Sequence, residues 1–258
     1  MQEAILARLA EIEKEKDLEV LYACESGSRS WGFASTDSDY DIRFIYRKPP
    51  GYYFQLKTPK RDTVTECGPL LDFHGWDIKK ALSLLPVPNA SLLEWLWAPI
   101  VYKPWNRIPI FRETIAMNSK ASIYHYVEMA EGNYKRYINR DPCSLKKYLY
   151  VIRPILAARW ILQFGGTPPV QFKNLLVNLP DDLFPAVNNL LTRKMAGEEL
   201  STGPRMPEID AWIEMVIPSI REEASELPFQ KKNDYELLNK MYREIVFEDL
   251  FGNHIEEE

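Results

Sequence analysis

Residues 39–46 read DYDIRFIY, a run in which charged and apolar side chains alternate from Asp39 to Phe44. Successive side chains of a β-strand point to opposite faces, so this alternation predicts a strand that is buried on one face only. The charged face would carry Asp39, Asp41 and Arg43, and the apolar face Tyr40, Ile42, Phe44 and Tyr46. Such a strand requires a sheet with one face in the core and one charged face available for chemistry.

Other segments of the first half supply partners for this strand. Apolar residues recur at helical spacing from residue 2 to about 16, and 18–25 (LEVLYACE) has the composition of a buried strand. After a polar, Pro-containing stretch, 69–76 (PLLDFHGW) is a third strand candidate, and Asp77 is suited to N-cap the helix that follows. The order helix, strand, turn, strand, strand, helix describes a small α/β unit.

From Ser91 onward the pattern changes, and strands nearly vanish. The sequence SLLE, from Ser91 to Glu94, predicts a capping box at the start of a helix. Apolar residues at helical spacing mark four later segments, namely 122–138, 144–164, 207–224 and 234–251. We therefore expect an α/β half that carries the chemistry and a helical half that follows it.

Composition places the chain among ordinary globular proteins. Of its 258 residues, 46% are hydrophobic and 27% charged. No apolar run approaches the ~20 residues that span a bilayer, and the N-terminus lacks the apolar block of a secretion signal, so we expect a cytoplasmic protein with no membrane partner. The net charge of −5 weighs against a surface built for long duplex nucleic acid and leaves a local basic groove open.

The cysteines suggest no covalent framework. Cys24, Cys67 and Cys143 lie far apart, and none belongs to a CxxC pair. An odd number without such a pair argues against both disulfides and a zinc site. We expect three reduced thiols in the core.

The clearest functional signal combines two motifs. Ten residues separate the pair Gly27 and Ser28 from Asp39-Tyr40-Asp41. Two carboxylates two residues apart on a strand project to one side, roughly 6 to 7 Å apart at the backbone, and their side chains can converge on ions about 4 Å apart. Hard oxygen ligands suit Mg²⁺ or Mn²⁺, which also bind substrate phosphates. The pattern predicts a site for two such ions, since adjacent carboxylates otherwise repel each other.

The Gly-Ser turn would complete the site. Gly27 would let the backbone approach a triphosphate without a Cβ, and Ser28 would offer its hydroxyl and amide to phosphate oxygens. Taken alone, each motif has a plainer explanation, because a DxD run can be a solvated edge and an SGS run only a turn. Their combination favours a functional site.

A third carboxylate is expected on a neighbouring strand, to bind metal or to act as a base. Asp72 is the first choice, because its side chain would share a face with His74 and Trp76. Asp77 is the runner-up, with its role as a helix cap as the competing explanation. Glu66 comes third.

The helix that begins near residue 144 offers cations. Lys146, Tyr150 and Arg153 follow one another at spacings of four and three, so they form one stripe. The cations could bind the β- and γ-phosphates and the Tyr ring could lie under the base or ribose, or the stripe could be a solvated face. Lys147 replaces Lys146 if the helix is rotated. Pro154 is expected to kink or restart the helix.

Three further residues have two readings each. Arg43 could pair with the third acid or reach the substrate, and a structural ion pair is favoured. Arg29 could contact the triphosphate or lie on the surface. His74 could be a base, although a lone histidine near a strand end is more often a packing residue. Most of the tryptophans, at helical spacing beside leucines, are expected in the core.

The segment ESGSRSWGFASTDSDYDIRFIY (25–46) resembles the signature of the DNA polymerase β nucleotidyltransferase superfamily. Within it the chain is most similar to the RNA-repair-associated RlaP, or YcgL-like, family. Three further stretches carry this resemblance, namely DFHGWDIKKALSLL (72–85), NASLLEWLWAPIVY (89–102) and KKYLYVIRPILAARWI (146–161). The similarity extends over roughly residues 18 to 165, and the core motif shows no departure from the family pattern.

The resemblance implies an α+β fold, with a nucleotidyltransferase domain of small mixed sheet and flanking helices at 1–115. A helical domain like that of poly(A) polymerases, at 116–258, would pack against it and complete the nucleotide cleft. The implied roles are metal binding for Asp39 and Asp41, phosphate contact for Gly27 and Ser28, and a third acid at Asp72 or Asp77. The implied reaction is transfer of NMP from an NTP, with ATP first among candidates, to a hydroxyl on an RNA end. A protein or small-molecule acceptor, or a noncatalytic nucleotide-binding or antitoxin module, is the alternative.

Overall fold

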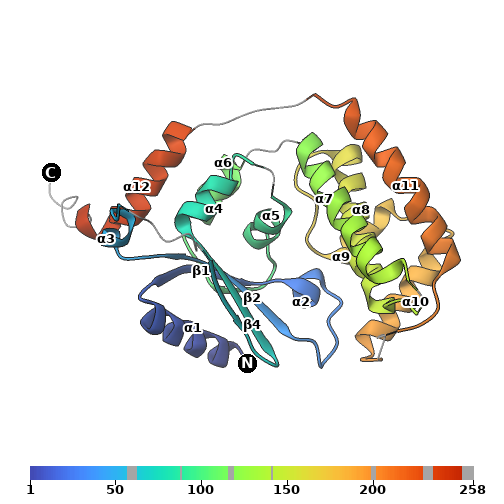
Figure 1. Cartoon of the computed structure of the whole chain (residues 1–258), viewed down its shortest axis with the longest axis horizontal. Helices are drawn as coiled ribbons and strands as arrows, with labels where there is room; N and C mark the ends of the chain where they lie inside the picture. The colour runs from blue at the N-terminus through green and yellow to red at the C-terminus, as the bar shows by residue number, and fades with distance from the viewer. Residues whose placement is uncertain are drawn as a thin grey trace.

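The computed structural model describes residues 1–56, 63–87, 89–115, 119–140, 142–198, 202–228 and 235–251, without the side chains of 248–251. A sheet with its covering helices forms one half of the molecule, and a group of helices forms the other (Figure 1). Over these residues, no helix is both long and apolar enough to cross a membrane.

Five strands form one sheet in the order β3-β4-β2-β1-β5. β2 and β4 run parallel, and the other neighbouring pairs are antiparallel. The strands are β1 (Glu19–Glu25), β2 (Tyr40–Arg47), β3 (Thr63–Cys67), β4 (Leu71–Asp77) and β5 (Val101–Lys103). This mixed sheet confirms the α+β class, and the strands predicted at 18–25, 39–46 and 69–76 are present.

Helices cover both faces of the sheet. α1 (Gln2–Lys16), predicted from its apolar spacing, packs on the face that carries Ile42 and Phe44. The opposite face, with Ile45, is covered by helices that share one hydrophobic cluster, namely α4 (Ile78–Leu84), α5 (Ala90–Leu96), α6 (Ile108–Thr114) and α12 (Tyr235–Phe251). The alternation predicted along β2 is therefore confirmed, and it directs Asp41 and Arg43 away from α1.

The helical half is built around α8 (Leu145–Phe164), which is buried along most of its length. α7 (Ser119–Asn133) packs along α8 and continues into a π-helical turn, η1 (Tyr134–Ile138). α11 (Pro207–Ser225) packs against both long helices. Shorter helices complete this half, namely α9 (Phe172–Leu175), η2 (Leu176–Asn178) and α10 (Phe184–Met195).

The last helix returns to the sheet half. α12 buries Met241 and Ile245 in the same cluster as Ile45 and Trp76, and Figure 1 shows it beside α3 (Pro50–Tyr53) and α4. Residues 116–118, at the boundary predicted between 1–115 and 116–258, lie outside the described residues. The predicted division stays a prediction, and its second part contributes a helix to the first half.

The predicted capping box is wrong, and so is one of the two outcomes predicted for Pro154. The N-cap of α5 is Asn89, whose Oδ1 accepts the Leu92 amide at 2.9 Å, and not Ser91. Pro154 does not restart the helix, since α8 is one continuous helix on both sides of it. The Tyr150 carbonyl, which has no Pro154 amide to accept, instead accepts Asn133 Nδ2 at 3.2 Å.

Candidate active site

A pocket of about 680 Å³ lies between the two halves. Its sheet wall carries three acids, Asp39, Asp41 and Asp72. The facing wall is the first two turns of α8, which contribute Lys146, Lys147 and Tyr150. The structure thus brings together two predicted groups that lie about a hundred residues apart in the chain, and the pocket is large enough for a small-molecule ligand.

Parallel pairing of β2 with β4 sets the acids side by side. Asp41 and Asp72 are register partners, and Asp39 immediately precedes β2. Arg43 Nη2 lies 2.8 Å from Asp41 Oδ1 and 3.1 Å from Asp72 Oδ2. The ion pair favoured for Arg43 is present, and it joins both acids.

The site concentrates negative charge. Burial raises the pKa of Asp41, the Arg43 guanidinium opposes that shift, and the charges of Asp72 and Asp39 add to it. Arg43 therefore offsets the combined effect of burial and the neighbouring carboxylates only in part. An additional cation at this wall would stabilise the ionised form of Asp41.

Carboxylate oxygens are the donors that Mg²⁺ and Mn²⁺ prefer. Over the described residues, no three His, Cys, Asp or Glu side chains are grouped closely enough to hold an ion as they stand. The Arg43 guanidinium takes one oxygen from each of Asp41 and Asp72. The donor chemistry and the excess negative charge fit a divalent cation, and the side chains must turn toward it to bind.

Gly27 begins the short helix α2 (Gly27–Trp31), where a simple turn was predicted. Its φ is +58°, and a Cβ there would lie 2.0 Å from Asp41 Oδ2. The preceding Ser26 donates its amide to the Asp41 carbonyl at 2.8 Å. Ser26 and Gly27 line the pocket, whereas Ser28 is buried outside it. The structure therefore brings Ser26 to the position at which Ser28 was predicted.

Sequence reasoning missed Glu25, the last residue of β1. It is 1% exposed, and its Oε1 accepts the Asp41 amide at 2.7 Å. Its Oε2 accepts the Tyr102 hydroxyl, and burial raises its pKa. The signal was an acidic residue that directly follows an apolar run and precedes a glycine turn. Glu25 fixes the start of β2 and hence the backbone of Asp41.

Arg29 lies outside the pocket lining. Its guanidinium donates to the Ser38 carbonyl at 2.6 Å and the Asp39 carbonyl at 3.2 Å, and lies 3.6 Å from the Tyr40 ring centroid. Lys194 of α10 donates to Ser35 Oγ in the same loop, at 2.8 Å. These contacts hold the loop that leads into Asp39, so the geometry supports a structural task for Arg29.

The stripe predicted on α8 divides into two parts. Lys146, Lys147 and Tyr150 line the pocket, but Arg153 does not. Arg153 is 2% exposed, and its Nη1 donates to Glu94 Oε1 at 2.6 Å. The other oxygen of Glu94 accepts Trp31 Nε1 at 3.0 Å. Arg153 therefore joins α8 to α5 and, through Glu94, to α2.

The rival third acids lie elsewhere. Asp77 caps α4 by accepting the Lys79 amide at 2.8 Å and accepts the Tyr53 hydroxyl at 2.9 Å. Glu66 pairs with Arg8 of α1 at 2.7 Å, on the face of the sheet that α1 covers. Of the three candidates, Asp72 alone lines the pocket.

His74 and Cys67 flank Asp72. His74 Nε2 accepts Trp76 Nε1 at 2.9 Å, its Nδ1 bonds the Thr65 hydroxyl at 3.0 Å, and burial lowers its pKa. Both ring nitrogens are engaged, as in a packing histidine. Cys67 is exposed, contrary to the prediction of three core thiols, and its Sγ lies 3.4 Å from Asp72 Oδ1.

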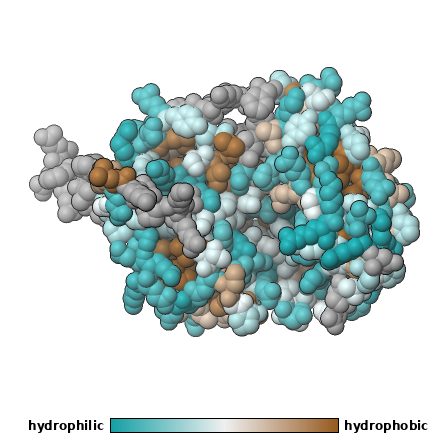
Figure 2. Space-filling model, viewed as in Figure 1, coloured by the Kyte–Doolittle hydropathy of each residue, from teal (hydrophilic) through white to brown (hydrophobic). Residues whose placement is uncertain are grey.

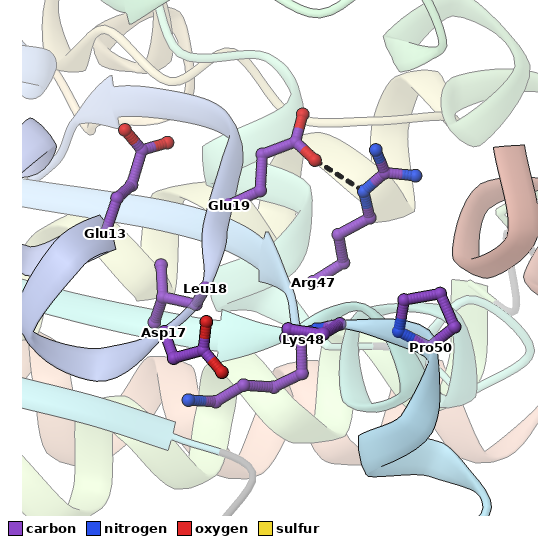
Figure 3. Close-up of a pocket in the computed structure, with 8 residues that line it drawn as sticks. Glu13, Asp17, Leu18, Glu19, Arg47, Lys48 and Pro50 are labelled. Atoms are coloured by element: carbon purple, nitrogen blue, oxygen red, sulfur yellow. Dashed lines mark hydrogen bonds and ion pairs between the residues drawn. The ribbon is translucent and has the colours of Figure 1, made fainter. Parts of the chain in front are cut away.

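A second pocket, of about 280 Å³, lies at the opposite end of β1 and β2. Figure 3 shows its mixed lining, in which Arg47 Nε donates to Glu19 at 2.6 Å and the Lys48 side chain extends below Asp17. Its charges are of both signs, and none of the predicted site residues lines it. The first pocket is therefore the candidate active site.

The mixed sheet and the acids of β2 and β4 define a protein of the polymerase β class. The chain belongs to the RNA repair pathway DNA polymerase beta family (RlaP), whose family model matches residues 1–244. It is 41% identical over 254 residues to the "Uncharacterized protein YcgL" of Bacillus subtilis (strain 168), covering 96% of this chain and 97% of that protein.

Proposed function

We propose that this protein is a metal-dependent nucleotidyltransferase that moves NMP from an NTP to a hydroxyl acceptor and releases pyrophosphate. The acceptor is an RNA end in repair or processing. One observation carries the proposal. Asp41 and Asp72 lie side by side with Asp39 on one wall of a pocket whose other wall carries Lys146 and Lys147. Support for the RNA acceptor comes from the family to which the chain belongs.

Asp39, Asp41 and Asp72 are the side chains that would hold Mg²⁺ or Mn²⁺, two ions in all. When bound, such ions lower the pKa of an attacking hydroxyl and neutralise charge on phosphate oxygens. Arg43 would release its bonds to Asp41 and Asp72 in part, and keep its contact with the Asp72 carbonyl at 3.1 Å. Glu25 holds the Asp41 backbone in place throughout.

The α8 wall binds the nucleotide. Lys146 and Lys147 present ammonium groups to the triphosphate, and the Gly27 backbone approaches it from the sheet side. The Tyr150 ring, which lines the same pocket, would lie against the base or ribose. Positive charge on one wall and carboxylates on the other orient the reacting phosphate between them.

In the reaction, the acceptor hydroxyl oxygen forms a bond to the α-phosphorus while the bond from that phosphorus to the bridging oxygen breaks. Pyrophosphate leaves with the bonding electron pair, and the hydroxyl proton passes to a carboxylate oxygen of Asp72. Asp72 is suited to this task because its strand lies at the pocket wall next to Asp41.

The test uses each α-labelled NTP, ATP first, with Mg²⁺ or Mn²⁺ and with RNA, cell protein or no acceptor. Label on RNA supports the proposal. Label on protein or on a small molecule would show that the acceptor is that molecule and not RNA. The double variant Asp39→Ala with Asp41→Ala should transfer nothing. Glu66→Gln, an acid outside the pocket on the neighbouring β3, is the matched control and should retain the activity. Label transfer by the double variant would overturn the mechanism.

A further inference from the structure

The segment that joins α7 to α8 concentrates positive charge beside the candidate active site. Residues 134–147 read YKRYINRDPCSLKK, with five basic residues and one acidic residue, in a chain of net charge −5. The basic residues are Lys135, Arg136, Arg140, Lys146 and Lys147. A local basic region on an acidic protein is the electrostatic footprint of a polyanionic ligand.

An aromatic ring lies among these cations. The Tyr137 ring centroid is 5.3 Å from the Arg136 guanidinium, 6.0 Å from that of Arg140 and 4.9 Å from Lys147 Nζ. Lys147 Nζ also lies 4.1 Å from the ring centroid of Tyr150. Arg136, Tyr137, Arg140 and Lys147 thus form a continuous basic strip that ends at Tyr150 in the pocket.

The cations of the basic strip lack acidic partners over the described residues, where no ion pair joins Arg136, Arg140 or Lys147 to a carboxylate. The acidic residue of the segment, Asp141, lies outside those residues. Burial lowers the pKa of Lys147, the charges of Lys146 and Arg136 lower it further, and the charge of Asp41 across the pocket opposes the shift. Like charges held this close are stabilised by a bound anion.

Hydrogen bonds to α11 and to the start of α8 fix the backbone that carries the basic strip. In η1, the Tyr134 hydroxyl donates to Glu214 at 2.8 Å and accepts from Arg205 at 2.8 Å, which ties the turn to α11. The Ser144 amide donates to the Tyr137 carbonyl at 3.1 Å, which joins the turn to the start of α8. Arg136 and Arg140 stay exposed. Single π-helical turns of this kind are frequent at functional sites.

A nucleotide confined to the pocket does not account for the strip. Lys147 and Tyr150 line the pocket, but Arg136, Tyr137 and Arg140 do not. The ligand that contacts all of them extends from the pocket over the surface. In Figure 2, the face over α7 and the helices beside it is largely hydrophilic, which suits a polar ligand.

We propose that the basic strip binds the single-stranded end of the RNA acceptor, with its phosphates on Arg136 and Arg140 and a base against Tyr137. An aromatic ring interleaved with cations is the pattern that binds single strands, because bases stack on the ring while the cations neutralise the backbone. A duplex, whose bases are already stacked, would leave the ring unused. The inference rests on the proposed function for its choice of an RNA acceptor.

Equilibrium binding tests the strip independently of catalysis. The full chain carrying Asp41→Asn is titrated with a labelled single-stranded oligoribonucleotide of about 12 nucleotides, within the range of single-strand site sizes. Arg136→Gln with Arg140→Gln should weaken binding by about tenfold or more and reduce the slope of log affinity against log salt by about 1.4, since each phosphate contact on a single strand contributes roughly 0.7. Tyr137→Leu should weaken binding by about fivefold or more.

The matched control removes two exposed cations elsewhere, Lys173→Gln with Arg243→Gln. It should leave both the affinity and the salt slope unchanged. Equal affinity of the strip variants and the control for the oligoribonucleotide overturns the proposal. Thermal unfolding of Tyr137→Leu shows whether a loss of affinity comes from the ring or from misfolding. Preferred binding of an RNA duplex or a peptide by the strip overturns it as well.

Kinetics separates the strip from the nucleotide site. In the protein with Asp41 intact, the double Arg variant should raise KM for RNA and leave KM for NTP unchanged. A rise in KM for NTP alone assigns the strip to the triphosphate and contradicts the inference. Strip-dependent RNA binding without any label transfer would instead sustain the inference and contradict the proposed function.

Discussion

A Cβ on Gly27 would lie 2.0 Å from Oδ2 of Asp41, well inside the contact distance of two atoms. The φ of Gly27 is +58°, a conformation that residues with a side chain rarely adopt. Glycine is therefore required here by the carboxylate beside it as well as by the backbone. The requirement holds before any triphosphate binds.

Gly27→Ala should displace the Asp41 carboxylate and reduce the rate of nucleotide transfer by about a hundredfold, the typical effect of misplacing a reacting group by 1 Å. The left-handed φ should also lower the free energy of unfolding by about 1 to 2 kcal/mol. Single-turnover transfer and urea unfolding measure the two effects. Gly51→Ala, at a position with open space around its Cβ, is the control and should lower neither. A fully active Gly27→Ala protein would contradict this account of Asp41.

The two aspartates at opposite ends of β4 should behave in opposite ways. Asp72→Asn should abolish transfer with little change in stability, because Asp72 lines the pocket and its side chain is 33% exposed. Asp77→Ala should keep the transfer activity and lose about 1 to 2 kcal/mol of unfolding free energy, because it removes a helix cap and the bond from Tyr53. Activity and urea unfolding are measured on both. Loss of transfer by a well-folded Asp77→Ala protein would restore Asp77 as the third acid.

The buried pair of Glu94 and Arg153 offers a double-mutant cycle. Their side chains are 11% and 3% exposed, so removing either partner leaves an unpaired charge in the interior. Glu94→Gln and Arg153→Met should each lower the free energy of unfolding by about 3 to 5 kcal/mol, and the double variant should lose much less than the sum. Urea unfolding of the four proteins measures the coupling. A stable Arg153→Met protein with a raised KM for NTP would support the phosphate contact predicted from the sequence.

The parts of the site that follow from local pattern were predictable. The period of two along 39–46 is a property of adjacent residues, and it placed Asp41 and Arg43 together on the face opposite the core of Ile42 and Phe44. The choice of Asp72 followed from its place on the next long strand. β3 and β5 have only five and three residues, which is too short for a pattern to emerge.

Contacts between distant segments were not predictable in the same way. The partner of Arg153 is Glu94, 59 residues away, and the Tyr102 hydroxyl that meets Glu25 is 77 residues away. Such pairs depend on how α8 and β5 pack, which no local period encodes. Ser26 lines the pocket where Ser28 was predicted to do so. α2 begins directly at Gly27, and the Ser28 side chain is buried within it.

His125 on α7 gives the stability a pH dependence of defined sign. Burial lowers its pKa below the unfolded value of about 6.5, and the charges of Glu128 and Glu94 oppose this shift. The unfolded chain therefore binds the proton more readily, so the stability contributed by the neutral ring is complete above about pH 6.5 and is lost as the pH falls toward the folded pKa. His74 changes in the same direction, because burial lowers its pKa too.

Replacing His125 should flatten this part of the profile. Urea unfolding of the parent and of His125→Gln, measured at several values between about pH 5 and pH 8, should show a smaller fall in unfolding free energy at low pH for the variant. The remaining fall should shrink again when His74→Gln is added, since both rings resist protonation for the same reason. Identical slopes for the parent and His125→Gln would show that the ring is hydrated in the folded protein, because a solvated imidazole has the same proton affinity in both states.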